Sequence, residues 1–230
     1  MKPWKTLSQA PGLEGQTLML QERDGVFVIR SGGRELMSSA RFHSEQEMAA
    51  VALKRVKAKN PVVLIGGLGL GYTVRATLDL LPPGGSVVVA EISPEVVAWN
   101  RGPLKHLAKA PLGDPRVTVE TADVAKVAAA GNQRFDAVLL DVDLGPSALA
   151  AKKNQRLYED KGIASLRGSL RPGGVLVVWS AGPDGPFLSR LGRAGFVATT
   201  ERSAARLGNA ASHVLFIAAL PTSGRRASSR

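Results

Sequence analysis

From about residue 62 onward, short apolar runs alternate along the chain with segments whose apolar residues recur at helical spacing. Short runs of Val, Ile, Leu and Ala predict strands that are buried on both faces, near 62–66, 86–91, 116–120, 135–141 and 174–179. Apolar residues at helical spacing between them predict helices near 72–81, 94–108, 155–170 and 184–194. Strands that alternate with helices form a mostly parallel, doubly wound sheet. The predicted fold class is therefore α/β and Rossmann-like.

The pattern changes at both ends of this region. Two apolar runs, near 196–201 and 213–220, have no helical pattern between them and predict an antiparallel hairpin that completes the sheet. The polar residues after them, 221–230, predict a disordered basic tail. At the other end, short strands at 17–21, 26–30 and 34–37 predict a small antiparallel unit, with a turn at Asp24-Gly25.

Two local features set the first domain boundary. The first sixteen residues contain Pro and Gly without periodicity and predict a loosely ordered lead-in. The segment Ser44-Glu-Gln-Glu47 predicts a capping box at the start of a helix whose apolar stripe is buried. The expected organisation is a lead-in and hairpin unit at 1–43, a main domain at 44–220 and a tail at 221–230.

Composition narrows the functional class. A hydrophobic fraction of 44% and a charged fraction of 21% are typical of a soluble globular protein, and no run of 18 apolar residues predicts a membrane span. The absence of cysteine excludes disulfides and thiolate chemistry, and the first residues lack a secretory pattern, so we expect a cytoplasmic protein. His43, His106 and His213 show no metal-ligand spacing, so we expect surface or packing roles for them and no metal.

The formal net charge of +11 favours anionic partners such as nucleic acid. The positive residues are scattered, however, with small clusters only at Lys152–Lys153 and Arg225–Arg226. We therefore do not expect a nucleic-acid partner. An RNA-modifying enzyme is an alternative that only the charge suggests.

A glycine-rich turn after the strand at 62–66 indicates a ligand site. Gly67, Gly69 and Gly71 allow a sharp turn and close approach of a ligand to the backbone. The next strand ends in Glu91, about 20 residues further on, where an acidic side chain usually holds ribose hydroxyls. A dinucleotide motif would need glycine where Tyr72 stands. The observed spacing is instead the form found in class I S-adenosylmethionine-dependent enzymes.

From about Thr17 to Leu220 the chain resembles the spermidine/spermine synthase family. The resemblance rests on the N-terminal hairpin and on the segments Gln46-Glu47-Met48, GGLGLGYTVR, VVVAEISPEVV, DPRVTVETAD, FDAVLLDVDLGP, Leu157-Tyr158-Glu159 and LRPGGVLVVW. Members of this family are aminopropyltransferases with a methyltransferase-like fold. The resemblance implies small-molecule substrates and a homodimer.

The resemblance also implies residue roles. It assigns donor binding to Gln46, Gly67, Gly69, Leu70, Gly71, Glu91, Ile92, Asp123 and Asp141, with Glu91 on the ribose and Asp123 on the adenine. It makes Asp141 the base that orients and deprotonates an amine nucleophile, and assigns the acceptor to Asp143, Tyr158 and Trp179. Simpler roles remain open: turn residues for both Asp141 and Asp143, a helix cap for Asp123, and packing for Trp179.

Two departures from the family pattern bear on the reaction. Leu70 stands where the family has an aspartate that holds the aminopropyl ammonium, and Asp141-Val-Asp143-Leu replaces Asp-Ser-Ser-Asp-Pro. We therefore expect methyl transfer from S-adenosylmethionine to a small amine or similar nucleophile. The alternatives are aminopropyl transfer from decarboxylated S-adenosylmethionine to a polyamine, and non-catalytic binding of an adenosine ligand. A loop with Lys152, Lys153, Asn154 and Arg156 suits an anionic or neutral acceptor.

Overall fold

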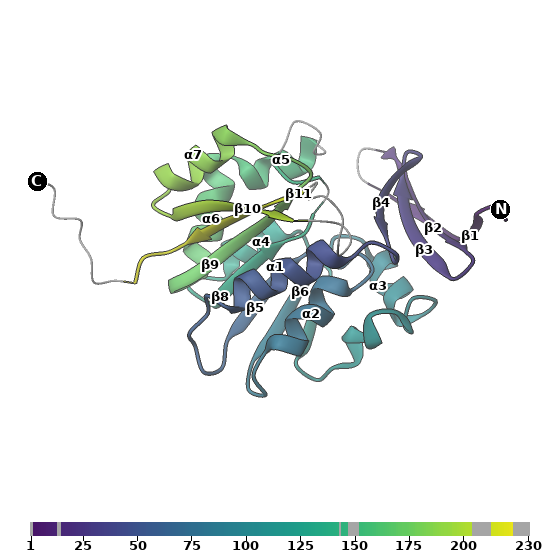
Figure 1. Cartoon of the computed structure of the whole chain (residues 1–230), viewed down its shortest axis with the longest axis horizontal. Helices are drawn as coiled ribbons and strands as arrows, with labels where there is room; N and C mark the ends of the chain where they lie inside the picture. The colour runs from purple at the N-terminus through teal and green to yellow at the C-terminus, as the bar shows by residue number, and fades with distance from the viewer. Residues whose placement is uncertain (1, 13–14, 143, 147–151, 204–212, 223–230) are drawn as a thin grey trace, which may run out of the picture.

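Two β-sheets form the framework of the protein (Figure 1). The computed structural model describes residues 2–12, 15–142, 144–146, 152–203 and 213–222. The smaller sheet is antiparallel and has the order β1-β2-β3-β4, built from β1 (Lys5–Pro11), β2 (Thr17–Arg23), β3 (Val26–Ser31) and β4 (Arg34–Ser38). It lies at one end of the larger unit, next to the N-terminus (Figure 1).

The larger sheet has seven strands in the order β10-β11-β9-β8-β5-β6-β7. Its strands are β5 (Val62–Gly66), β6 (Ser86–Ala90), β7 (Val117–Glu120), β8 (Phe135–Leu140), β9 (Leu170–Ser180), β10 (Val197–Ser203) and β11 (His213–Ala219). Strands β5 to β9 pair in parallel, and β11 and β10 add in antiparallel orientation. The predicted α/β fold class and the final hairpin are confirmed.

Helices cover both faces of this sheet (Figure 1). They are α1 (His43–Leu53), α2 (Tyr72–Leu80), α3 (Pro94–Arg101), α4 (Val124–Ala130), α5 (Lys152–Tyr158), α6 (Asp160–Ser169) and α7 (Gly185–Arg193). Successive strand residues point to opposite faces. On β5, Val63 and Ile65 pack with α1, α2 and α3, whereas Leu64 packs with α4, α6 and α7.

The prediction of a loosely ordered lead-in is wrong, because residues 5–11 form β1. Its sequence is mostly polar, and the strand exists through its pairing with β2. Ala10 is the buried residue of this strand, and the Arg23 guanidinium lies 4.3 Å from the centre of the Trp4 ring. These contacts join residues distant in sequence, so local periodicity carries no sign of them.

The predicted capping box is also wrong. Helix α1 begins at His43 with Phe42 as its N-cap, and no side chain caps it. Ser44 lies inside the helix, where its hydroxyl donates to the Glu45 carboxylate (2.5 Å). Glu47 accepts a hydrogen bond from Ser203 and pairs with His43 at 3.3 Å.

Two predicted helices differ from expectation, one because it ends early and one because it is divided. The helix at 94–108 ends at Arg101, because Gly102 and Pro103 follow, and short 3-10 turns η2 (Leu107–Lys109) and η3 (Pro111–Gly113) continue the chain. The helix at 155–170 is two helices that meet at Glu159. None of the helices described is long and apolar enough to cross a membrane. The predicted tail lies outside the described residues from position 223 onward.

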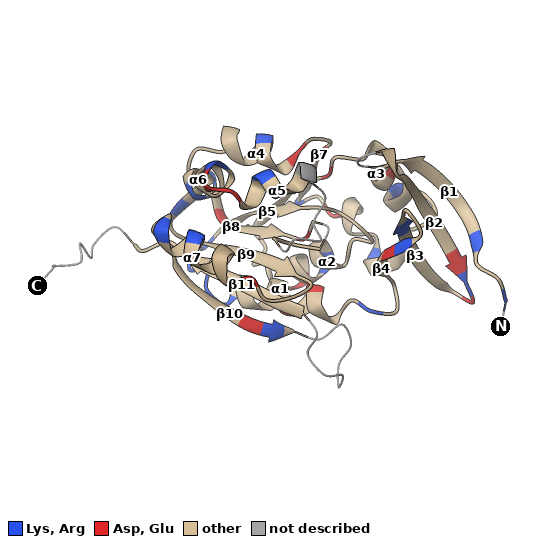
Figure 2. Ribbon diagram, turned by 90° about the horizontal axis from the view of Figure 1, so that it is seen from above, with Lys and Arg blue, Asp and Glu red and all other residues tan. Residues whose placement is uncertain are grey.

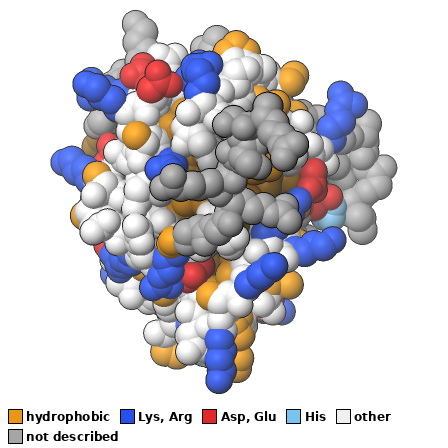
Figure 3. Space-filling model, turned by 90° about the vertical axis from the view of Figure 1, so that its left-hand side faces the viewer, with side chains coloured by type: hydrophobic (Ala, Val, Ile, Leu, Met, Phe, Trp, Pro, Cys, Tyr) orange, Lys and Arg blue, Asp and Glu red, His pale blue; other side chains and the backbone are white. Residues whose placement is uncertain are grey.

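Basic residues are spread over the protein. Lys and Arg occur on the outer helices and on the small sheet (Figure 2), and they are separated by uncharged side chains on the face drawn in Figure 3. No large basic surface is visible on that face, which agrees with the scattered positive charge in the sequence.

A buried carboxylate joins three strands of the large sheet at the edge where the parallel strands begin. Asp136, at the start of β8, accepts hydrogen bonds from the Val62 amide (2.8 Å) and from the Arg171 guanidinium (2.5 Å). The side chain of Asp136 is 11% exposed, so its loss leaves the Val62 amide without this partner in a buried position.

We therefore expect Asp136→Ala to lower the free energy of unfolding by about 2–4 kcal/mol. Asp79→Ala is the control, since the Asp79 side chain is 51% exposed and its i,i+4 pair with Arg75 should contribute about 0.5 kcal/mol. Urea denaturation of both variants measures the difference. Equal, small losses would show that Asp136 does not stabilise the sheet.

Candidate functional site

A cavity of about 1200 Å³ lies between the carboxyl ends of the parallel strands and the small sheet. One wall consists of the turns after β5, β6 and β8, and the opposite wall of residues from β4 and the segment before α1. Ligands of open α/β sheets bind at this edge, where the strand order reverses. The order reverses here between β5 and β8, so the cavity occupies the expected position.

The glycine turn forms the floor of the cavity. Gly67 has a φ of +90°, and a Cβ there would overlap the Asp141 carbonyl oxygen, so only glycine fits. Gly69 has a φ of +52° and leaves space for the Met37 sulfur from the small sheet. The Asn100 side-chain amide donates to the Gly69 carbonyl at 2.8 Å and fixes the turn from α3.

Glu91 connects the glycine turn to the turn after β6. Its two carboxylate oxygens accept hydrogen bonds from the Leu68 and Ser93 amides, each at 2.9 Å. Burial raises the pKa of Glu91, and these amides oppose that shift. Glu91 also lines the cavity, beside Ile92, which is 41% exposed.

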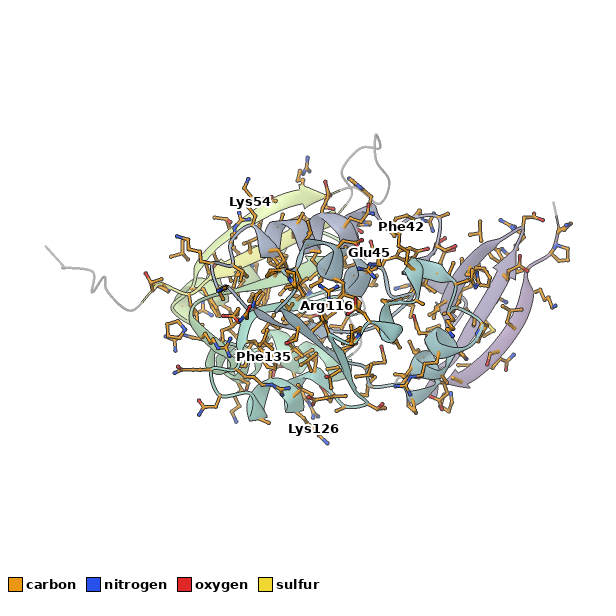
Figure 4. All side chains as sticks on the ribbon, turned by 90° about the horizontal axis from the view of Figure 1, so that it is seen from below. Phe42, Glu45, Lys54, Arg116, Lys126 and Phe135 are labelled. Carbon is orange, nitrogen blue, oxygen red and sulfur yellow. The ribbon has the colours of Figure 1, made fainter. Side chains whose placement is uncertain are left out.

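Two carboxyl groups from different elements line the cavity, and the charge of one acts on the other. Asp141 follows β8 and accepts a hydrogen bond from the Thr73 hydroxyl of α2 at 2.6 Å. Glu45 lies in the first turn of α1, at the end nearest the small sheet (Figure 4). Burial, and next the negative charge of Asp141, raise the pKa of Glu45 to about 7. Burial also raises the pKa of Asp141, and the Thr73 hydroxyl partly offsets this shift.

Aromatic residues form the rim and the far end of the cavity. The Phe42 and Tyr72 rings stack with their centres 4.1 Å apart, and Tyr72 lines the cavity. At the far end, the Trp179 ring lies against the His213 ring at 4.6 Å. Burial lowers the pKa of His213, and the positive charge of Arg41 lowers it further.

The cavity is acidic although the protein is basic. Its described lining contains the carboxyl groups of Glu35, Glu45, Glu91, Glu95, Asp123 and Asp141, and the guanidinium groups of Arg34 and Arg41. Carboxylates in a cleft with low-dielectric walls concentrate the electric field and attract cations locally. The arrangement can therefore hold a positively charged ligand and accept a proton from it.

The structure brings most of the predicted site residues together. The cavity is lined by Gly67, Gly69, Leu70, Glu91, Ile92, Asp123, Asp141 and Trp179. Asp123 also caps α4, where its carboxylate accepts from the Ala125 amide at 2.9 Å, so its predicted role as a helix cap is observed, while its role on the adenine stays a prediction.

Four predicted residues do not join them. Gln46 is exposed and lies outside the cavity lining, and Gly71 is the N-cap of α2 and packs against Pro111. Tyr158 is 2% exposed and borders a separate small cavity of about 280 Å³. Asp143 lies outside the described residues.

The sequence analysis missed three polar residues of the cavity. Glu45 was interpreted as part of a capping box, although its position just before the Gln46-Glu47-Met48 segment could have marked it. Thr73 carried no sequence signal, because only the fold brings it to Asp141. His213 was expected to be a surface or packing residue, but it lines the cavity, and its Nδ1 has no hydrogen-bond partner among the described residues.

The fold and the cavity define an α/β protein of the class I methyltransferase-like type with an added N-terminal sheet. The family model of the spermine/spermidine synthase domain matches residues 41–188. The chain therefore belongs to the spermine/spermidine synthase domain family.

Two curated relatives share this likeness. The chain is 32% identical over 129 residues to a polyamine aminopropyltransferase of Korarchaeum cryptofilum, covering 54% of the chain and 37% of the relative. It is 30% identical over 153 residues to polyamine aminopropyltransferase 2 of Caldanaerobacter subterraneus subsp. tengcongensis, covering 61% and 50%. The chain thus spans half or less of the length of these relatives.

Solved structures show the same fold. A spermidine synthase in complex with the transition-state analogue AdoDATO matches with a TM-score of 0.78 and 18% identity, covering 93% of this chain and 73% of that one. The spermidine synthase from Thermotoga maritima matches with a TM-score of 0.74 and 17% identity, covering 93% and 72%. The expectation of methyl transfer gains no support from these relatives, which agree better with the aminopropyl alternative.

The raised pKa of Glu45 predicts a change of stability with pH. Its carboxyl titrates near 4.5 when unfolded and near 7 when folded, so the folded state favours the protonated form. This stabilisation is complete below pH 4.5 and is lost as the pH rises through 7. We expect Glu45→Gln, which cannot titrate, to reduce this loss by about 2 kcal/mol, allowing for partial solvent screening.

Chemical denaturation of the wild type and Glu45→Gln at pH 5, 6, 7 and 8 measures the effect. Glu120→Gln is the control, because Glu120 ends β7 and does not line the cavity. If the wild type and Glu45→Gln show the same pH dependence, Glu45 titrates at an ordinary pKa.

Proposed function

We propose that this protein transfers an aminopropyl group from decarboxylated S-adenosylmethionine to an amine acceptor. The family assignment and the names of both curated relatives support this reaction. The observation that carries it is the pair formed by Glu45 and Asp141, in the middle of an acidic cavity. Such a pair suits an ammonium group that must bind and then lose a proton.

The donor would occupy the half of the cavity next to β6. Glu91 would accept hydrogen bonds from the ribose hydroxyls, Ile92 would pack on the adenine, and Asp123 would accept from the adenine amino group. Gly67 and Gly69 would let the sulfonium end approach the backbone. In this position the reactive carbon would face Asp141.

The carboxyl pair would prepare the acceptor. An amine is an ammonium ion at neutral pH and cannot attack until it loses a proton. Glu45, with a pKa of about 7, is close to half ionised at pH 7 and can both attract the ammonium and take its proton. The neutral nitrogen then forms a bond to the aminopropyl carbon, the carbon–sulfur bond breaks, and its electron pair stays on sulfur. The products are the extended amine and uncharged methylthioadenosine.

The two arguments for methyl transfer weaken once the cavity is described. Leu70 does line the cavity without a carboxylate, but Glu45 of α1 adds a carboxyl group to the lining. The overall charge of +11 argues against a cationic ligand, yet the acidic lining sets the local field. The homodimer and the cytoplasmic location stay predictions.

Product analysis tests the proposed reaction. The purified protein is incubated with 1,4-diaminobutane and with 4-aminobutyrate, each combined with either donor, and the nucleoside product is identified by mass spectrometry. We expect methylthioadenosine from the decarboxylated donor. Formation of S-adenosylhomocysteine from intact S-adenosylmethionine would replace the proposal with methyl transfer, and no product from either donor would refute both.

A substitution of Glu91 tests the donor site. Glu91→Ala removes hydrogen bonds from a charged group, so we expect donor binding to weaken by about 1.5–3 kcal/mol. Glu120→Ala is the control, because Glu120 ends the neighbouring strand β7 and does not line the cavity. Calorimetry gives both affinities, and unchanged binding in a folded Glu91→Ala variant would place the ribose elsewhere.

A substitution of Asp141 tests the transfer centre. Asp141→Asn keeps the size of the side chain but loses its charge, so we expect kcat to fall about 100- to 1000-fold with little change in donor affinity. Asp160→Asn, at an 81% exposed side chain on α6, is the control. A full kcat in Asp141→Asn would remove Asp141 from the chemistry.

A further inference from the structure

Two threonines of α2 use their hydroxyl groups differently. Thr77 is fully buried and donates to the Thr73 carbonyl at 2.8 Å, four residues back, as threonines inside helices commonly do. Thr73 is 3% exposed, but its hydroxyl leaves the helix and donates to the Asp141 carboxylate at 2.6 Å. The carbonyl four residues before Thr73, that of Gly69, accepts from the Asn100 side chain instead. Thr73 therefore connects α2 to the proposed transfer centre.

Asp141 is held at both its main chain and its side chain. Its amide donates to the Gly66 carbonyl at 2.9 Å, and its own carbonyl oxygen lies where a Cβ on Gly67 would be. The bond from Thr73 uses the Oδ2 of Asp141, so Oδ1 can accept a hydrogen bond from a ligand in the cavity. The direction of the carboxylate is therefore set before a ligand binds, as a reacting site requires.

The Thr73 hydroxyl also favours one protonation state of Asp141. A hydroxyl that donates to a carboxylate stabilises its ionised form. Burial raises the pKa of Asp141, and the Thr73 hydroxyl opposes this shift. Burial, and next the negative charge of Asp141, raise the pKa of Glu45 to about 7. The charge of Asp141 acts on Glu45 only while Asp141 is ionised, so a single proton shared by the two carboxyl groups resides on Glu45.

Other titratable groups of the cavity leave this order unchanged. Those that line it from the neighbouring elements are Arg41, Tyr72, Glu91, Asp123 and His213. Burial and then the charge of Glu45 raise the pKa of Tyr72, so its hydroxyl is neutral near pH 7. Burial and then the charge of Arg41 lower the pKa of His213, so its imidazole is neutral there as well. Among the described residues, none of these five groups contributes to the pKa shift of Glu45 or Asp141.

We infer that Thr73 is a positioning residue that keeps Asp141 ionised and directed into the cavity, and so leaves Glu45 to take the proton of the acceptor. The proton passes from the acceptor ammonium to the Glu45 carboxylate, while Asp141 stays a carboxylate and holds the nitrogen. The neutral nitrogen then bonds to the aminopropyl carbon, and the electron pair of the carbon–sulfur bond leaves with sulfur. The inference rests on the proposed function for the reaction, whereas the division of charge between the two carboxyl groups can be measured without turnover.

A carbon-13 NMR titration of the carboxyl groups in the full chain tests this division. Thr73→Val keeps the shape of the side chain and removes its hydroxyl, and the Glu45 signal is identified by its absence from Glu45→Gln. We expect Glu45 to titrate near pH 7 in the wild type and about one pH unit lower in Thr73→Val, because the proton moves to Asp141 and the Asp141 charge is lost. An unchanged Glu45 titration in Thr73→Val would overturn the inference.

Three further variants separate the hydroxyl from general effects on the helix. Thr77→Val is the matched control, because it removes a buried hydroxyl from the same helix at a position that does not line the cavity. Thr73→Ser keeps a hydroxyl and should restore the wild-type titration. Thr73→Ala also lacks the hydroxyl and repeats the test with a smaller side chain. If Thr77→Val lowers the Glu45 titration as much as Thr73→Val, or if Thr73→Ser fails to restore it, Thr73 has only a structural role.

The pH dependence of turnover gives a second measurement, with the decarboxylated donor and 1,4-diaminobutane as substrates. We expect Thr73→Val to lower kcat about 10- to 100-fold with little change in the KM for the donor, since Asp141 loses its fixed position. The acidic limb of the kcat profile should move to lower pH together with the Glu45 titration. Thr73→Ser should recover most of the activity. A wild-type kcat and pH profile in Thr73→Val would contradict a positioning role.

The two measurements distinguish this inference from the proposed function. If the wild type forms methylthioadenosine and Thr73→Val titrates as the wild type does, the inference fails and the proposed function stands. If Thr73→Val shifts the Glu45 titration but the wild type forms no methylthioadenosine, the division of charge stands and aminopropyl transfer fails.

Discussion

The site depends on one buried carboxylate, that of Glu91, which joins two turns of the sheet edge. By accepting the Leu68 amide it holds the glycine turn, and by accepting the Ser93 amide it holds the start of α3. Asn100 on α3 then fixes Gly69 from the other side. The glycine turn in turn determines where α2 begins, and α2 carries Thr73 to Asp141. The Glu91 carboxylate thus holds the turns after β5 and β6 together, and through them the start of α2 beside Asp141.

Burial and charge act together around Asp141. Burial of Glu45, and next the negative charge of Asp141, raise the pKa of Glu45 to about 7, so its carboxyl can hold or release a proton near neutral pH. The same cavity is acidic inside a protein with a net charge of +11, so net charge alone says little about the ligand. The arrangement of charges within a low-dielectric cleft decides which ligand is attracted.

The sequence predicted the part of the molecule that local pattern controls. Buried strands, the glycine turn and Glu91 were all visible, because each depends on a few neighbouring residues. Strand β1 was not, since its polar residues are ordered by pairing with β2. Glu45 and His213 were missed for a related reason. Both residues line the cavity only because the fold brings α1 and β11 to the same edge of the sheet. The hydrophobic periodicity of the sequence does not predict which elements lie close together in the fold.

Two successive parts of the chain line the cavity: the small sheet with the segment that follows it, and the larger α/β unit. The family model begins at residue 41, after the small sheet has ended. The small sheet supplies Met37 and leads to Arg41, whereas Glu91 and the glycine turn belong to the larger unit. A change in the small sheet can therefore reshape one wall of the binding space while the residues of the glycine turn and Glu91 stay the same.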